Sequence, residues 1–321
     1  MDPVCHTLVG AGLARSGLAR RTALGTATLL IGANLPDVDA LAYLWGPGAD
    51  LAFRRGWTHG VLALALGPFV LAGAMVLLDR LLRRFRPSPS GAAVQPGQLL
   101  VLAGISILSH PALDTLNTYG VRWLMPFSGR WFYGDTLFIV DPWMWLTLGI
   151  GVLASRRAAS DRPARFALWV AFGYAAAMGV GAMAARRIAS EELAAISGAP
   201  VHRILVSPVP VNPFRRRVVA EQGGEYRTAS FRWLSTPHLD PAAVRVYAKG
   251  PRDHPAVRQA AATTVGRRFL VWARFPAFQV EQRAGELTVH IVDLRYADRA
   301  GEGFGAVSIP VRLPSYSEVT E

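Results

Sequence analysis

The stretch GVLALALGPFVLAGAMVLL, residues 60–78, decides the class of this chain, because it contains no charged side chain. A helix of this length can cross a hydrocarbon layer of about 30 Å. A second uncharged stretch, FALWVAFGYAAAMGVGAMAA, covers residues 166–185. Over all 321 residues, 51% are hydrophobic and only 17% are charged. This composition is too apolar for an ordinary soluble domain of this size and indicates a protein in contact with a lipid bilayer.

Four weaker apolar segments accompany these two stretches. They cover about residues 3–14, 22–36, 98–118 and 137–154. The first two are short and suit half-spanning or tilted helices, and the other two contain ionisable residues. Glycine and proline inside the segments do not exclude membrane helices, which tolerate both. The sequence therefore predicts an α-helical polytopic membrane domain of about six apolar helices.

The remainder of the chain carries charges throughout and has strand-like segments. EYRTASFRW and ELTVHIVDLRY, which begin at Glu225 and Glu286, are rich in β-branched and aromatic residues. RFLVWARF, residues 268–275, is predicted as another strand, and Gly223-Gly224 as the turn of a hairpin. We therefore expect two domains, a membrane-embedded helical domain and a β-rich α+β soluble domain, which cover residues 1–185 and 186–321.

Arginines orient the predicted helices, because cytoplasmic loops are enriched in basic residues. One set of loops holds eleven, namely Arg15, Arg20, Arg21, Arg80, Arg83, Arg84, Arg86, Arg156, Arg157, Arg162 and Arg165. The opposite short loops hold four, namely Arg54, Arg55, Arg122 and Arg130. We expect a multi-pass protein of the bacterial inner (cytoplasmic) membrane with its C-terminal domain on the outer side. The net charge of +12 is thus explained by arginines that orient the chain in the membrane. No nucleic-acid partner is expected, since no aromatic-basic motif accompanies this charge.

Histidines and aspartates gather at the outer end of these segments. They are His6, Asp37, Asp39, His59, His110, Asp114, Asp135 and Asp141. Neutral imidazole and carboxylate groups bind zinc and similar divalent ions, and an open coordination position can activate water. His110 and Asp114 are four residues apart, which places them on one face of a continuous helix. Pro111 between them allows a kink, or a new helix capped by Ser109.

Each member of this layer also has a simpler explanation. His6 alone suits an interfacial polar residue, His110 and Asp114 suit a hydrogen bond between helices, and Asp135 and Asp141 suit helix caps. The convergence of the whole layer at one membrane face favours a metal site over these separate roles. Asp37 or Asp39 is then a candidate general base, and Arg55 and Arg122 are candidates for neutralising an anionic substrate.

The spaced motifs resemble those of a known family. HTLVGAGLA, NLPDVDAL, RGWTHG, SHPALDTLNTYG and WFYGDTLFIVDP, in this order, are similar to the YdjM-like family of LexA-regulated, membrane-bound, predicted metal-dependent hydrolases over about residues 1–185. That family in turn is distantly similar to the zinc-dependent phospholipase C and P1-type nuclease superfamily. By position, the resemblance implies metal ligands at His6, Asp37 or Asp39, His59, His110 and Asp114. The chain departs from that superfamily because it has no histidine between His110 and His202. A site for one or two metals, completed by Asp135 or Asp141, is therefore expected rather than one for three.

These observations predict a membrane-bound hydrolase that holds a divalent metal ion, zinc by its ligand types, and uses metal-activated water. The resemblance implies a phosphodiester or phospholipid-type substrate, so a small molecule or a lipid. Two alternatives come from other classes. Intramembrane histidine and aspartate also serve ion or proton-coupled transporters, and the membrane part is alternatively a non-catalytic scaffold for the C-terminal domain.

Overall fold

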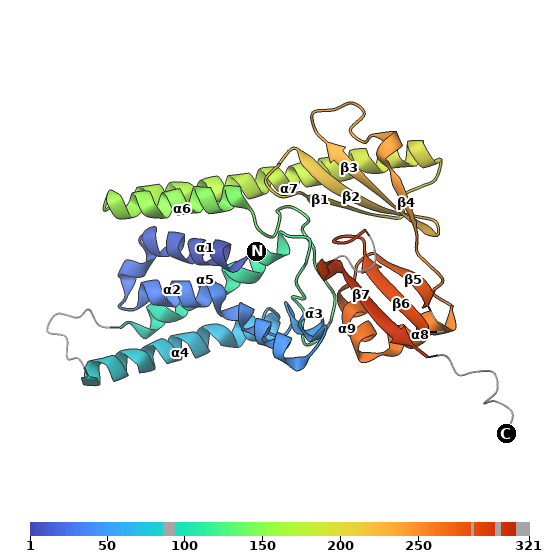
Figure 1. Ribbon diagram of the computed structural model, residues 1–321. Coiled ribbons are helices and arrows are strands. Elements are labelled where there is room, and N and C mark those ends of the chain that lie inside the picture. Colours follow the sequence, from blue (N-terminus) through green and yellow to red (C-terminus); the bar gives the residue numbers. More distant parts are fainter. Residues whose placement is uncertain (86–93, 284–285, 299–302, 313–321) are drawn as a thin grey trace, which may run out of the picture. The chain divides into compact units, whose positions relative to one another are not determined.

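The computed structural model describes residues 1–85, 94–283, 286–298 and 303–312 (Figure 1). The chain divides into two compact units. The first comprises Met1–Ala40, Arg54–Met183 and Ser207–Pro213, and the second comprises Leu41–Phe53, Ala184–Val206 and Phe214–Glu321. Helix α7 runs through the division, so the two units share one continuous element.

The first unit is a bundle of helices. In chain order it contains α1 (Pro3–Arg15), the short η1 (Leu18–Arg21), α2 (Gly25–Asn34), the beginning of η2 (Leu35–Trp45), α4 (Val61–Phe85), α5 (Pro96–Thr115), α6 (Pro142–Arg157) and the amino-terminal part of α7 (Arg162–Ser197). Helix α2 packs against α1 and α5, and α4 packs against α5. The side chains of Leu71 and Met75 meet those of Leu99 and Ile107 in the core between α4 and α5.

Aspartate and proline mark where two of these helices begin. The carboxylate of Asp2 accepts hydrogen bonds from the Val4 and Cys5 amides, and Pro3 occupies the first helical position. Asp141 caps α6 in the same manner, with Pro142 after it. An aspartate cap satisfies amides that lack a partner at a helix start, and proline there loses no hydrogen bond. Local sequence thus fixes both starts.

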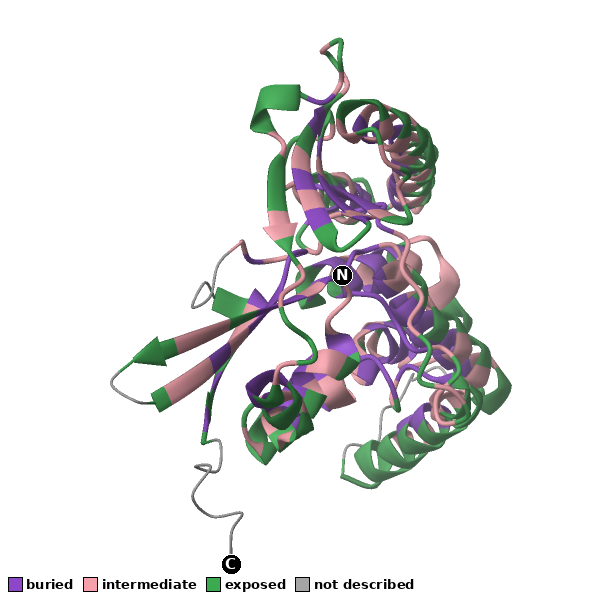
Figure 2. Ribbon diagram, turned by 90° about the vertical axis from the view of Figure 1, so that its right-hand side faces the viewer, coloured by how far each residue is buried: buried purple, intermediate pink, exposed green. Residues whose placement is uncertain are grey.

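Helices α4, α5 and α7 are long and apolar enough to cross a membrane. Their apolar windows remain largely uncovered by the protein; in α4 and α7 only 17% of the window is buried (Figure 2). Helices α1, α2 and α6 have 13, 10 and 16 residues. A full crossing takes about 17–25 residues, so these three are short for it. The described residues therefore provide three candidate spans, and the expected six are not shown.

Gly32 on α2 lies directly against α5. A β-carbon at Gly32 would overlap the hydroxyl of Ser106. We expect Gly32→Ala to separate α2 from α5 and to destabilise the protein by about 1–3 kcal/mol. Ser106→Ala in the same chain should restore much of this loss, because the Ser106 hydroxyl bonds only to carbonyls of its own helix in the described contacts. Thermal unfolding of the purified protein, followed by circular dichroism, measures both effects. Equal stability of Gly32→Ala and the wild type would contradict the close approach.

The second unit contains two antiparallel sheets. The first has the order β1-β2-β3-β4 and the second the order β5-β6-β7. The strands are β1 (Arg203–Pro208), β2 (Arg215–Gln222), β3 (Glu225–Arg232), β4 (Arg245–Ala248), β5 (Pro276–Arg283), β6 (Glu286–Asp293) and β7 (Ala306–Val311). The end of α7 packs on the first sheet, where Ala189 and Leu193 meet Val218 and Phe231. The predicted hairpin at Gly223-Gly224 is confirmed by the pairing of Gln222 with Glu225.

Short helices complete this unit, and one of them corrects a prediction. They are α3 (Ala49–Phe53), η3 (Pro241–Ala243), α8 (Pro255–Ala262), α9 (Thr264–Trp272) and η4 (Gly303–Gly305). RFLVWARF was predicted as a strand, but most of it lies in α9. The Thr263 hydroxyl caps this helix through the Gly266 amide, and the buried side chains Phe269 and Trp272 are three residues apart, on one helical face.

Candidate metal centre

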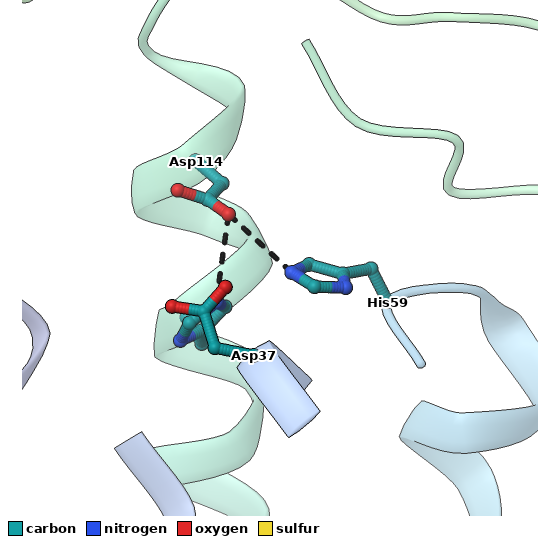
Figure 3. A group of neighbouring side chains, drawn as sticks. Asp37, His59 and Asp114 are labelled. Carbon is teal, nitrogen blue, oxygen red and sulfur yellow. Dashed lines mark ion pairs between the residues drawn. The ribbon is translucent and has the colours of Figure 1, made fainter. Parts of the chain in front are cut away.

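Four side chains from three separate segments converge in the first unit. They are Asp37, His59, His110 and Asp114, and each offers one ligand atom such that all four atoms lie within 4.8 Å of one another. Asp37 follows α2, His59 precedes α4, and the other two lie on α5. Figure 3 shows Asp37, His59 and Asp114 with their polar ends directed toward one another. Residues far apart in the sequence thus form one polar cluster, here called the four-residue group.

Helix α5 supplies two members of the group. It is continuous through Pro111, so His110 and Asp114 lie one turn apart on the same face as predicted. His110 Nε2 lies 3.4 Å from Asp114 Oδ2 and 3.7 Å from Asp37 Oδ1. The other ring nitrogen, Nδ1, lies 2.7 Å from the backbone carbonyl oxygen of Ala33 on α2. Only a protonated Nδ1 can donate to a carbonyl, which leaves the lone pair on Nε2 facing the group.

His59 is held by a neighbouring carboxylate. Its Nε2 lies 3.4 Å from Asp114 Oδ2, and its Nδ1 lies 3.3 Å from Asp39 Oδ2. The Thr58 hydroxyl lies 2.9 Å from both His59 Nδ1 and Asp39 Oδ2. Burial lowers the pKa of His59 to about 4, although Asp39 opposes this shift. At neutral pH the imidazole is therefore uncharged, with Nδ1 oriented by Asp39 and Nε2 free to bind a metal.

Both aspartates that follow α2 are ionised. Burial alone would raise the pKa of Asp37, but the hydrogen bond and charge of His110 outweigh it and the pKa is lowered. For Asp39, burial likewise raises the pKa, and the hydrogen bonds from His59 and from the Arg55 amide bring it below the usual value. The Arg55 amide donates to Asp39 Oδ2 over 2.7 Å. Both carboxylates thus carry negative charge beside the imidazoles of His59 and His110.

The donor set fits a divalent cation. His59 Nε2, His110 Nε2 and Asp114 Oδ2 are buried and have no hydrogen-bond partner among the described residues. Three lone-pair atoms that face one another in a buried site are costly unless a proton or a cation lies between them. Two imidazole nitrogens and two carboxylate oxygens are ligands that zinc accepts in a tetrahedral arrangement. The four-residue group therefore has the chemistry of a metal site.

His6 lies beside the group. Its ring stacks on that of His110 at 3.7 Å between centroids, and its Nε2 lies 3.3 Å from Asp114 Oδ1. Neither ring nitrogen of His6 has a hydrogen-bond partner among the described residues. The amino group of Met1 also contacts Asp114 Oδ1. Asp114 therefore directs one oxygen toward His59 and His110 and the other toward His6.

Arginines surround the carboxylates. Arg55 Nη2 lies 3.0 Å from Asp114 Oδ1, and Arg55 Nη1 donates to Asn117 Oδ1 over 2.8 Å. Arg122 donates to the backbone oxygen of Arg54 over 3.1 Å, and its guanidinium lies 4.8 Å from the ring centroid of Trp131. Arg55 thus contacts the group directly, whereas Arg122 packs beside the segment that carries Arg55.

The structure does not bring Asp135 or Asp141 into the group. Asp141 Oδ1 accepts hydrogen bonds from the Trp143 and Met144 amides, and its Oδ2 accepts one from the Tyr174 hydroxyl. Asp135 is buried and has a positive φ of 53°. The sequence-predicted residues that meet are therefore His6, Asp37, Asp39, His59, His110 and Asp114, with Arg55 beside them.

The comparison with protein families agrees with this location. The family described as YdjM inner membrane protein matches residues 1–188, which contain every residue of the group. The chain belongs to the YdjM inner membrane protein family. Family membership and the three apolar helices together make it a membrane protein. No curated protein and no solved structure gives a significant match to the chain.

Within this YdjM-family domain, several positioning residues were not predicted from the sequence. Thr58 bonds His59 and Asp39, Asn117 bonds Arg55, and the Ala33 carbonyl orients His110. Arg54 was counted only for orientation, yet its Nη2 lies 3.3 Å from Asp37 Oδ1. Thr58 and Asn117 lie inside the motifs RGWTHG and SHPALDTLNTYG, so the motifs could have indicated them. The role of the Ala33 carbonyl could not be predicted from the sequence, because every residue has a backbone carbonyl.

Asp39 should act on metal affinity through His59. We expect Asp39→Asn to weaken metal binding by about 10–100-fold while one ion still binds at saturation, because the neutral amide supports His59 less well. Titration of the purified apoprotein with zinc measures both affinity and stoichiometry. Asp79→Asn, a change at a half-buried position near the end of α4 and outside the group, is the control and should leave the affinity unchanged. Loss of the saturable site would instead make Asp39 a direct ligand.

Proposed function

We propose that this protein is a metal-dependent hydrolase of the bacterial inner membrane, with zinc as its metal and a phosphodiester or phospholipid as its substrate. The observation that carries the proposal is the convergence of buried atoms from His59, His110 and Asp114 beside Asp37. These three atoms have no hydrogen-bond partner in the part of the chain that the structure describes. The motif order that resembles metal-dependent hydrolases supports it. The distant similarity to zinc-dependent phospholipase C and P1-type nuclease is the source of the substrate class.

Distinct roles follow for the residues of the site. His59, His110, Asp37 and Asp114 would hold the ion, with His6 next to Asp114 for a second one. A bound divalent ion would supply Lewis acidity and lower the pKa of a nearby water molecule. Of the two candidate general bases, we assign proton acceptance to Asp37, because Asp39 Oδ2 is already engaged by three donors.

Arg55 and Arg122 belong to the same proposal. A phosphate ester brings negative charge to a site that already contains Asp37, Asp39 and Asp114. Buried guanidinium groups offset such charge and form strong hydrogen bonds with phosphate and carboxylate oxygens. Arg55 does so for Asp114 in the described contacts. We propose that both arginines lower the cost of placing an anionic substrate beside three carboxylates.

The site is proposed to face the outer side of the membrane. In the first unit, the α1–α2 and α6–α7 connections and the arginine-rich end of α4 lie at one end of the helices, and the start of α1 and the end of α2 lie at the other (Figure 1). The arginine-rich end is proposed to be cytoplasmic. A periplasmic reporter fused after Glu321 should then be active. A signal from a cytoplasmic reporter at the same position would place the site on the inner face.

Metal analysis tests the hydrolase proposal first. We expect the purified protein to contain at least one equivalent of zinc or a similar ion, and His59→Ala and His110→Ala to lose it. His202→Ala, in the second unit, is the control and should keep the metal. Hydrolysis of a chromogenic phosphodiester should disappear with the metal and return when zinc is added back.

Three results would overturn the proposal. Absence of any divalent ion in wild-type protein, with the same content in both histidine variants, would exclude the site. Ion flux in proteoliposomes that depends on Asp114 and proceeds without ester turnover would favour transport instead. Full function of His110→Ala together with loss of function on deletion of residues 186–321 would favour a scaffold.

A further inference from the structure

Asp37 is the partly exposed member of the four-residue group. Its side chain is 15% exposed, whereas those of His59, His110 and Asp114 are 0% exposed. A molecule that approaches these four residues from outside therefore meets Asp37 first. The surroundings of Asp37 then determine which kind of substrate can reach the buried atoms.

Asp37 lines an apolar groove on the surface of the first unit. The groove has a volume of about 540 Å³ and lies along the end of α2 and the start of η2. It is bordered by Pro3, Leu30, Ile31, Asn34, Leu35 and Val38, in addition to Asp37. Sites for small molecules have volumes of roughly 300–1,000 Å³ and combine apolar walls with a few polar groups. The groove has both properties, and its charged end is part of the metal group.

Exposed apolar side chains form the wall of this groove. Ile31 and Val38 are 43% and 51% exposed. Helix α2 packs against α5, which is one of the three candidate membrane spans. Uncovered apolar side chains beside a membrane helix mark a surface suited to lipid chains or other apolar ligands. The groove is therefore suited to molecules dissolved in the bilayer.

A cation stands where the groove meets the metal group. Arg54 Nη2 lies 3.3 Å from Asp37 Oδ1, Arg54 Nε lies 3.5 Å from Asp39 Oδ1, and the Arg54 side chain is 23% exposed. A guanidinium group can bind a phosphate oxygen as well as a carboxylate oxygen. The groove thus has an apolar length, and Arg54 pairs with the carboxylate at its charged end. A molecule with a hydrocarbon chain and an anionic headgroup matches this arrangement.

We propose that this groove binds one hydrocarbon chain of an anionic membrane phospholipid and that Arg54 guides its phosphate ester toward the metal group. The inference rests on the proposed hydrolase function for its purpose, but it concerns the groove that adjoins the four-residue group at Asp37. It narrows the substrate from phosphodiesters in general to lipids that enter from the bilayer. It also assigns chain binding to Ile31 and Val38, for which no role was predicted.

Photo-crosslinking tests chain binding without any need for turnover. The full-length protein is placed in nanodiscs with phosphatidylglycerol that carries a diazirine in its acyl chain. We expect crosslinks to concentrate on residues 30–38. Ile31→Trp, which fills the groove, should lower them by about 10–200-fold, the range that one misfit in an apolar pocket produces. Ile150→Trp, on the exposed face of α6, is the matched control. Val38→Trp is a second filling variant, and metal content shows that each variant keeps the site.

Equal crosslinking of residues 30–38 and of the α6 face in wild-type protein would overturn the proposal, because the groove would then bind lipid no better than the rest of the surface. The same holds if both filling variants crosslink like the wild type. Arg54→Gln adds a test of the headgroup. Competition by unlabelled phosphatidylglycerol should exceed competition by phosphatidylcholine in the wild type, and the difference should vanish in this variant.

Turnover separates this proposal from the hydrolase proposal. Two substrates are compared, phosphatidylglycerol in vesicles and the soluble bis(p-nitrophenyl) phosphate. If both proposals hold, Ile31→Trp lowers turnover of the lipid and spares that of the soluble diester. Groove-specific crosslinking without turnover of either substrate would retain the groove and reject the hydrolase. Turnover of both substrates that is unchanged in Ile31→Trp and Val38→Trp would retain the hydrolase and reject the groove.

Discussion

Asp114→Asn is expected to abolish stoichiometric metal binding and to lower any metal-dependent turnover by well over 100-fold. Changes next to a metal ligand already cost about 10–100-fold in affinity, and Asp114 contributes an oxygen that faces both His59 and His110. The amide keeps the size of the side chain but loses its charge, and it brings an NH₂ donor into a cluster that needs acceptors. Metal content after purification and zinc titration of the apoprotein are the measurements.

Asp141→Asn is the matched control for this change. Asp141 is also a buried aspartate in the first unit, but it caps α6 and lies outside the four-residue group. Its amide variant should keep the metal and change stability little, because asparagine caps a helix about as well as aspartate. A normal metal content in Asp114→Asn, or an equal loss in both variants, would contradict the assignment of Asp114.

Arg55→Met is expected to lower the free energy of unfolding by about 3–5 kcal/mol, because removing one partner leaves a buried carboxylate without compensation. Arg55 is 4% exposed and contacts Asp114 Oδ1 at 3.0 Å and Asn117 Oδ1 at 2.8 Å. Its guanidinium also lies 4.6 Å from the centroid of the Tyr119 ring. Thermal unfolding of the apoprotein in detergent measures the loss.

Added zinc should reduce this loss, since a cation in the group compensates the same carboxylate that Arg55 compensates. The double variant Arg55→Met/Asp114→Asn should be more stable than Arg55→Met alone for the same reason. Arg187→Met removes a partner from an exposed ion pair on α7, so it should change stability little. If Arg55→Met unfolds like Arg187→Met, the buried ion pair contributes little to the fold.

The sequence predicted the strongest membrane helices because uncharged length is a direct requirement of the bilayer. The segments around residues 60–78 and 166–185 became α4 and part of α7. Three of the four weaker segments became α1, α2 and α6, which are short for a crossing; α2, for example, begins only at Gly25. The fourth, around residues 98–118, became the candidate span α5. The extent of such helices depends on packing, which hydropathy does not report. The prediction of a strand at RFLVWARF was wrong for a related reason. A short apolar run suits either a strand or the buried face of a helix.

The residues of the site could be predicted from the sequence, but the contacts that each of them makes could not. The six histidines and aspartates of the site lie at one end of the apolar segments, and the length of these segments is enough to predict that they share this end. They are His6, Asp37, Asp39, His59, His110 and Asp114. Which of Asp37 and Asp39 faces His110 depends on the turn after α2, where the backbone directs one toward His110 and the other toward His59. Local backbone geometry decides this difference. Because both residues are aspartate, their identity in the sequence could not predict it.

The contact from His110 to the Ala33 carbonyl makes the orientation of this imidazole, and with it the proposed metal binding, depend on the register between α2 and α5. Because the acceptor is main chain, replacing the side chain at position 33 cannot remove it, and a scan of substitutions would overlook it. A small sliding or tilting of one helix against the other would misalign the imidazole while every side chain stays the same. Lipids of different chain length alter helix tilt. If the four-residue group binds an ion as proposed, the thickness of the bilayer is then expected to change the affinity for that ion.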